Sequence, residues 1–156
     1  MNARQLSLIA LLVLILGAMV VPTLAADKTK TVTITLTETE INNSYRVTNP
    51  ARRSITNVHV DLQPGQVYIT ADFTAPKSSP IPVSATLVPS VSNGRVFWSV
   101  TAASANGKPA STELLAQINA SISSSWRNYW KGKNPGHVTS LTITDDTISW
   151  MKVYSK

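Results

Sequence analysis

The side chains that most often carry enzyme chemistry are few in this sequence and are not grouped. The chain has two histidines and no cysteine. Neither His59 nor His137 has another metal-binding residue at ligand spacing, whereas a zinc site needs three or four ligands. We therefore expect both histidines to be ordinary surface residues, and we predict neither a metal site nor a cofactor.

The carboxylates and serines make no better case for catalysis. Asp145 and Asp146 are adjacent in a predicted tight turn, where their side chains point apart. Glu38 and Glu40 are accounted for by a predicted helix cap. A serine nucleophile needs a placed base and oxyanion donors, and the sequence contains no Gly-x-Ser-x-Gly pattern. These observations predict that the protein is not an enzyme.

The N-terminal segment indicates export. Arg4 gives a short positive start, and residues 6–21 form a stretch of apolar or small residues without charge. Thr23 and Ala25 fit the small positions that precede a signal-peptidase cut. The pattern predicts a signal peptide at residues 1–25 and a mature protein that works outside the cytoplasm, in the periplasm or cell envelope.

An uncleaved membrane anchor is the alternative for this segment. A spanning helix needs about 20 apolar residues, and the apolar run here is shorter and is followed by Pro22. Cleavage is therefore the favoured interpretation. The remaining residues, 26–156, are enough for a single domain with a real core. Because they contain no cysteine, the stability of that domain must come from buried apolar area.

The net charge of +6 at pH 7 is modest and scattered along the chain. An anionic membrane surface is a candidate partner for such a protein. Nucleic acid is not, because the basic residues are not interleaved with aromatic ones.

Hydrophobic periodicity predicts strands and two helices in the order β-α-β-β-β-β-α-β-β. The first helix, residues 38–46, begins with a capping box made by Thr37 and Glu40. Turn signals at Pro64-Gly65 and Asn93-Gly94 predict two hairpins. The predicted strands are residues 31–36, 55–62, 67–74, 82–91, 95–103, 138–144 and 147–154. Such connections predict an α+β fold, a twisted and mostly antiparallel sheet wrapped on one long helix.

The long helix is predicted at residues 111–131, with Gly132 as its stop. Its apolar stripe is Leu115, Ile118, Ile122, Trp126 and Tyr129, and its predicted polar face is Asn119, Ser121, residues 123–125 and Asn128. In the strand at residues 95–103, alternation predicts inward side chains at Val96, Trp98, Val100 and Ala102.

Four tryptophans are many for a chain of this size, and a well-packed core accounts for them. The functional alternative is that helix and sheet do not close fully and leave an apolar groove for a lipid chain, with basic residues at its mouth to meet the head group. The residues predicted to bind such a ligand are Trp98, Leu115, Ile118, Ile122, Trp126 and Trp150.

Several short segments resemble a known family. These are TETEIN at the start of the first helix, LLAQIN in the long helix and the closing PGHVTSLTITDDTISW. The order is similar to that of the LmeA-like phospholipid-binding proteins and their YpmS-like relatives. In those proteins a helix opens with Glu-x-x-(Leu/Ile)-Asn, here Glu38 to Asn42, and a final hairpin corresponds to Pro135 to Ser149. The resemblance covers most of residues 31–150. It implies a half-barrel fold akin to the TULIP lipid-binding proteins and an envelope protein that binds phospholipid.

Two functions stay open at this point. The first is an exported protein that binds phospholipid or another apolar ligand between the long helix and the sheet. The second is a structural or protein-interaction domain of the envelope with a closed core, and an accessory or inhibitor of an enzyme is a minor third. Whether the core is closed separates the first two.

Overall fold

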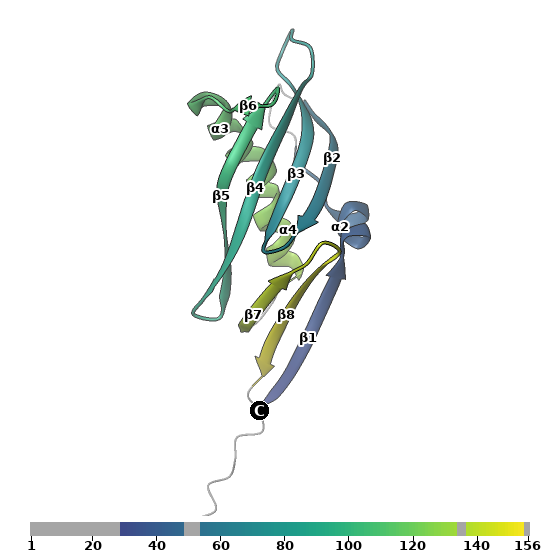
Figure 1. Ribbon diagram of the computed structural model, residues 1–156, viewed down its shortest axis with the longest axis vertical. Coiled ribbons are helices and arrows are strands. Elements are labelled where there is room, and N and C mark those ends of the chain that lie inside the picture. The colour runs from purple at the N-terminus through teal and green to yellow at the C-terminus, as the bar shows by residue number, and fades with distance from the viewer. Residues whose placement is uncertain (1–28, 49–53, 134–136, 155–156) are drawn as a thin grey trace, which may run out of the picture.

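The strands of this protein form two antiparallel sheets, of three and five strands, beside one long helix (Figure 1). The computed structural model describes residues 29–48, 54–133 and 137–154, and the predicted signal peptide at residues 1–25 lies outside them. The predicted α+β fold class is confirmed. In chain order the elements are β1 (Lys30–Thr37), α2 (Glu38–Ser44), β2 (Ser54–Gln63), β3 (Gln66–Thr74), β4 (Ile81–Ser92), β5 (Arg95–Ala105), β6 (Lys108–Pro109), α3 (Thr112–Ile118), the π-helical turn η1 (Asn119–Ser123), α4 (Ser124–Lys133), β7 (Val138–Ile143) and β8 (Thr147–Tyr154).

The five-stranded sheet has the order β2-β3-β4-β5-β6 and is made of hairpins between neighbours in the chain. Its strands show the predicted alternation most clearly in β3, where Val67, Ile69, Ala71 and Phe73 are all buried. The turn residues Gly65 and Gly94 have φ values of 79° and 72°. Glycine reaches such positive values without strain, which is why these two turns were readable in the sequence.

A β-bulge in β5 corrects one predicted face. Val100 lies opposite Leu87 and Ala102 lies opposite Thr86, so no residue of β4 lies directly opposite Thr101. The extra residue reverses the alternation of side chains beyond it. Ala103, and not the predicted Ala102, therefore packs against the core, and Ala102 is exposed.

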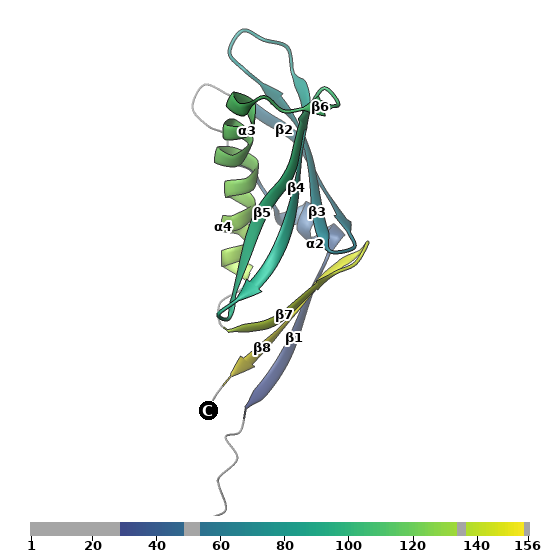
Figure 2. The ribbon, with the colours of Figure 1, turned by 60° about the vertical axis from the view of Figure 1, so that its left-hand side comes forward.

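The segments α3, η1 and α4 form one continuous helix of 22 residues that lies along one face of the five-stranded sheet (Figure 2). It begins after Ser111, whose side chain accepts a hydrogen bond from the Leu114 N–H, as a helix cap does. Its predicted stop at Gly132 is wrong, because the helix runs through Gly132 to Lys133. A glycine in the last turn costs a helix only about 1 kcal/mol.

The helix face predicted to be polar is partly buried. Ser121, Ser123 and Ser125 all lie in the interior. The stripe Ile118, Ile122, Trp126 and Trp130 has a strict spacing of four residues, which drifts around a regular helix of 3.6 residues per turn. The wider π-helical turn η1 reduces this drift, and the small serines beside the stripe let the helix approach the rest of the core.

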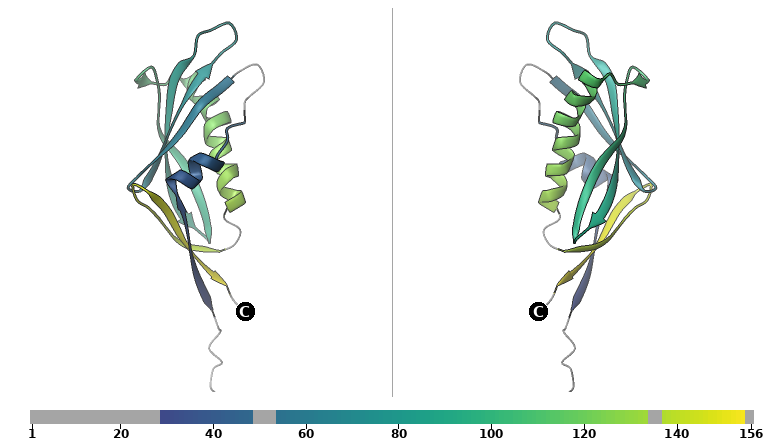
Figure 3. Two further views of the ribbon diagram at one scale, coloured as in Figure 1. Left: turned by 90° about the vertical axis from the view of Figure 1, so that its right-hand side faces the viewer. Right: turned by 90° about the vertical axis from the view of Figure 1, so that its left-hand side faces the viewer.

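The three-stranded sheet, of order β1-β8-β7, lies beyond the end of α4 (Figure 3). The outer edge of β7 meets the turns of two hairpins of the larger sheet. The Gly65 N–H donates to the Ile143 carbonyl at 3.2 Å, and the Val138 N–H donates to the Gly94 carbonyl at 2.9 Å. The predicted strands thus divide between two sheets, which these backbone hydrogen bonds join.

The short helix α2 has the predicted capping box. The Thr37 hydroxyl accepts from the Glu40 N–H at 3.2 Å, and the Thr37 N–H donates to the Glu40 carboxylate at 2.8 Å. The helix ends at Ser44, two residues before its predicted end at Arg46.

Two further side chains of α2, those of Asn42 and Glu38, cover the outer edge of β2. Asn42 donates to the Val60 carbonyl and accepts from the Val60 N–H, both at 2.8 Å. Glu38, which the sequence assigned to the helix cap, instead accepts from the Leu62 N–H at 2.8 Å. These side chains supply the hydrogen bonds that a neighbouring strand would otherwise make.

Candidate ligand-binding groove

Four of the six predicted ligand-binding residues are enclosed in the core between the long helix and the sheets. The exposed fractions of Ile118, Ile122, Trp126 and Trp150 are 1%, 1%, 0% and 2%. The half-buried Leu115 lines a small pocket of about 120 Å³ beside Val100–Ala103 and Ala110. Only Trp98 of the predicted set lies at a larger cavity. Ligand contact by the other five stays a prediction.

Aromatic rings fill the interior where the groove was expected. Trp126 packs edge-on against Trp98 and Tyr45, with ring centroids 5.3 and 5.4 Å apart. Trp130 packs in the same way against Trp98 and Trp150, at 5.4 and 4.9 Å. The Tyr45 hydroxyl donates to the Ile122 carbonyl at 2.8 Å, and burial raises the pKa of Tyr45. The core is therefore closed around these aromatic rings.

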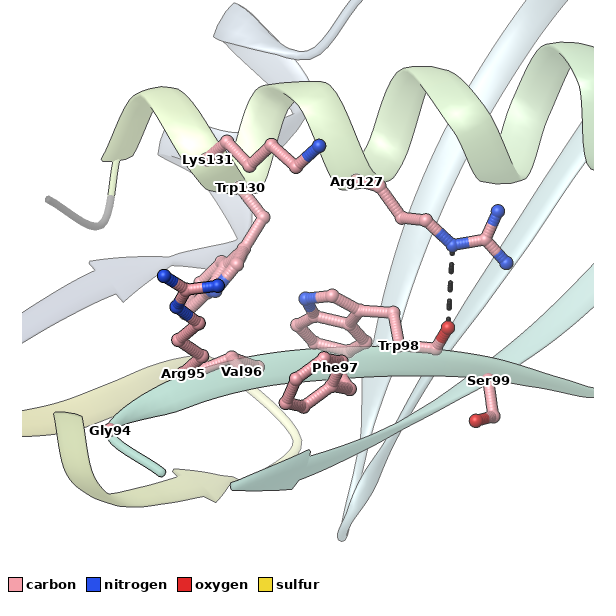
Figure 4. Close-up of a pocket in the computed structure, with 9 residues that line it drawn as sticks. All are labelled: Gly94, Arg95, Val96, Phe97, Trp98, Ser99, Arg127, Trp130 and Lys131. Atoms are coloured by element: carbon pink, nitrogen blue, oxygen red, sulfur yellow. Dashed lines mark hydrogen bonds between the residues drawn. The ribbon is translucent and has the colours of Figure 1, made fainter. Parts of the chain in front are cut away.

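A groove of about 690 Å³ lies at the outer side of this cluster, between β5 and α4 (Figure 4). Its lining consists of Gly94, Arg95, Val96, Phe97, Trp98 and Ser99 from the β4–β5 turn and β5, and of Arg127, Trp130 and Lys131 from α4. The β4–β5 hairpin and the last turns of the long helix therefore position the site.

The groove combines aromatic rings with positive charge. Phe97 is 51% exposed, and Trp98 and Trp130 form the buried floor. Arg95, Arg127 and Lys131 line the groove, and no carboxylate is among the lining residues. The Arg127 guanidinium donates through Nε to the Trp98 carbonyl at 3.3 Å. The site is suited to a ligand that has an apolar part and a negative charge.

Two buried hydrogen-bond donors lie beside the groove. The indole N–H groups of Trp98 and Trp130 are buried and bond to no other described residue. In Figure 4 the indole nitrogen of Trp98 lies on the side of the ring that faces α4. The indole N–H groups of Trp126 and Trp150 in the closed core are also buried without a partner among the described residues, so these donors are shared by the whole tryptophan cluster and do not distinguish the groove.

The predicted site did not include the five charged or aromatic residues that line the groove beside Trp98: Arg95, Phe97, Arg127, Trp130 and Lys131. A signal for part of this set was present, because Arg127 and Lys131 are four residues apart and share a helix face. Phe97 had no signal, since alternation places it on the face of β5 opposite to Trp98.

The two histidines and the Asp145–Asp146 pair lie on different segments of the structure. His59 is exposed on β2, and Asp145 and Asp146 are exposed in the β7–β8 turn. His137 lies against Gly94, where a Cβ atom would overlap its ring. Within the described part of the chain, no three histidine or carboxylate side chains are grouped as metal ligands.

Comparison with known proteins identifies no relative. No family model matches the chain, and neither do the curated proteins or the solved structures. The resemblance to LmeA-like and YpmS-like proteins, with its TULIP-type fold, therefore stays a prediction. None of the described helices is both long and apolar enough to span a membrane.

Proposed function

We propose that this protein is exported and binds an amphipathic, negatively charged lipid in the α4–β5 groove. The ligand chain would lie on the floor formed by Trp98 and Trp130, and its charged group would lie among the three cations. The observation that carries this proposal is the groove itself, in which two tryptophan side chains and three positive side chains occur together without a carboxylate. Its volume of about 690 Å³ is within the usual range for small-molecule sites.

The proposed site differs from the one expected from the sequence. The stripe of α3 and η1 is packed against the sheet, so a lipid chain has no free space beside Ile118 or Ile122. The lipid would instead bind along the outer edge of β5, where Trp98 is the residue shared by the predicted and the observed sites. The closed core also keeps the alternative, an interaction domain of the cell envelope, as a second candidate.

Binding of single-chain lipids tests the proposal. We expect the mature protein to bind lysophosphatidylglycerol, which is anionic, more tightly than lysophosphatidylcholine, which is zwitterionic, below their micelle concentrations. Titration followed by tryptophan fluorescence gives both affinities, because Trp98 and Trp130 form the floor of the groove. Native mass spectrometry of the purified protein would show whether such a lipid is carried along.

A charge-reversal pair locates the site. The double variant Arg127→Glu, Lys131→Glu should bind the anionic lipid about tenfold more weakly or worse, because two attractive charges become repulsive. The matched control is Lys30→Glu, Lys108→Glu, which changes the net charge equally at two exposed positions outside the groove. Equal loss in both variants, or no lipid binding by the wild type, would show the proposal to be wrong.

A further inference from the structure

The groove opens on the backbone edge of β5 and not on one of its faces. Its lining includes six consecutive residues, from Gly94 to Ser99. Side chains of a strand point alternately to its two faces, so a cavity over one face would be lined by every second residue. Figure 4 agrees, since Trp98 and Phe97 lie on opposite sides of the β5 ribbon.

The backbone groups on this edge are available for hydrogen bonding. The Trp98 carbonyl accepts from Arg127, on the side away from β4. Backbone groups alternate between the two sides along an antiparallel strand, so those of Val96 and Val100 point the same way. β6 pairs only with Ser104 and Ala105. Within the described residues, therefore, no strand covers the outer edge of β5, the edge away from β4, from Arg95 to Ala102.

Two other strand edges in the structure are covered. Asn42 and Glu38 bond to the backbone of β2, and the turns at Gly65 and Gly94 bond to β7. An open edge with apolar surface invites pairing with another chain, and folded proteins usually block it. At β5 the neighbouring helix instead leaves a groove bordered by arginine and lysine side chains.

We propose that an extended, acidic segment of another protein adds to β5 as a further strand, between β5 and α4. Binding of this kind takes its affinity from main-chain hydrogen bonds and its selectivity from alternate side chains. This function goes beyond lipid binding, and because both ligands need the groove, they would exclude one another.

Charge complementarity gives the chemistry of the partner. Arg95, Arg127 and Lys131 border the edge, and the groove has no carboxylate of its own. An incoming strand takes the Trp98 carbonyl from Arg127, which frees the guanidinium to pair with a carboxylate of the peptide. Side chains of an added strand alternate between its two faces, so the glutamates that face α4 meet Arg127 and Lys131, and the apolar side chains between them lie on the opposite face, beside Phe97.

The test uses a panel of blocked eight-residue peptides that alternate glutamate with valine, isoleucine, phenylalanine or tyrosine, and a second panel with lysine in place of glutamate. We expect at least one acidic peptide to bind and the lysine peptides not to bind. Amide hydrogen exchange, followed by NMR, should show the Val100 N–H exposed in the free protein and protected in the complex. If no acidic peptide binds at up to about 1 mM, the proposal is wrong.

Two substitutions at one position separate backbone pairing from side-chain contact. Val100→Pro removes an N–H that points away from β4, so the β4–β5 ladder is kept. It should weaken peptide binding about tenfold or more, whereas Val100→Ala, which keeps the N–H, should have little effect. Val100 lies outside the lipid groove, so both variants should bind lysophosphatidylglycerol as the wild type does. Equal effects of proline and alanine on the peptide would overturn the proposal.

The remaining outcomes also decide the question. Peptide binding unchanged in Arg127→Glu, Lys131→Glu would show that these two cations do not recognise the carboxylates of the peptide and would contradict the proposal. Protection of the Val100 N–H that depends on protein concentration alone, with a dimer in sedimentation experiments, would make a second copy of this chain the occupant. Lipid binding without any peptide binding would leave the proposed function in place and remove this one.

Discussion

The outermost long strands of the five-stranded sheet, β2 and β5, have very different surroundings. At β2, Asn42 and Glu38 make three hydrogen bonds of 2.8 Å to the backbone of Val60 and Leu62. At β5, the outer backbone edge from Arg95 to Ala102 has no neighbouring strand among the described residues, and Arg127 makes a single longer bond of 3.3 Å to Trp98.

The difference lies in the length and charge of the side chains that face each edge. The short amide of Asn42 holds α2 close to β2 and satisfies both backbone groups of Val60. On α4, the long side chains of Arg127 and Lys131 line the groove of about 690 Å³. A free edge is an aggregation hazard unless it is blocked or used. The β2 edge is blocked by α2, whereas the β5 edge borders the groove in which we propose that a ligand binds.

The largest expected effect is on stability, and it tests whether the core beneath both strands is closed. Trp126→Arg should lower the free energy of unfolding by about 3–5 kcal/mol, because it places an unpaired charge in a fully enclosed site. Urea unfolding followed by circular dichroism measures this loss. If the core instead opened into a lipid groove, the variant would fold with nearly unchanged stability and lose lipid binding.

The neighbouring Arg127→Ala is the control for that experiment. Arg127 is half-buried at the groove and makes one long hydrogen bond. We expect its removal to cost about 1 kcal/mol or less. A loss as large as that of Trp126→Arg would mean that the groove residues are part of the structural core.

The second largest effect is expected from a substitution that uncovers the edge of β2. Asn42→Ala removes two hydrogen bonds to the partly buried backbone of Val60 and should cost about 1–3 kcal/mol of unfolding free energy. The matched control is Asn43→Ala, an exposed asparagine in the same helix, which should stay within about 0.5 kcal/mol of the wild type. Equal stability of the two variants would show that α2 does not protect the β2 edge.

The smallest effect concerns the cap that orients α2. The backbone N–H of Thr37, and then its hydroxyl, donate to the Glu40 carboxylate and lower its pKa. A lowered pKa in the folded protein stabilises it above the ordinary pKa of glutamate, and this contribution is lost as the pH falls through the folded value. The stability advantage of wild type over Glu40→Gln should therefore be larger at neutral pH than in acid. Thermal unfolding of both proteins from neutral to acidic pH measures the difference. An advantage that grew in acid would contradict the role of the Glu40 carboxylate in the cap.

The sequence by itself was sufficient wherever neighbours along the chain decide the structure. The turns at Gly65 and Gly94 require backbone angles that glycine adopts freely. The capping box needs only residues three positions apart, Thr37 and Glu40. The inward face of β3 follows from simple alternation. The α+β class followed from these local elements, since hairpins and one long amphipathic helix have few ways to pack.

Other features were decided only by contacts between distant segments. The bulge at Thr101 moved Ala103 inward, and the π-helical turn and the close approach of the helix buried serines that the pattern placed outside. The site differs for the same reason. Trp126 and Trp98 are both tryptophans on apolar faces, and the sequence treated them alike. Trp126 is enclosed by Tyr45 and Trp98, whereas Trp98 borders a groove because β6 covers β5 only at Ser104 and Ala105. How far one strand covers another depends on the whole arrangement of the sheet, which no local period in the sequence encodes.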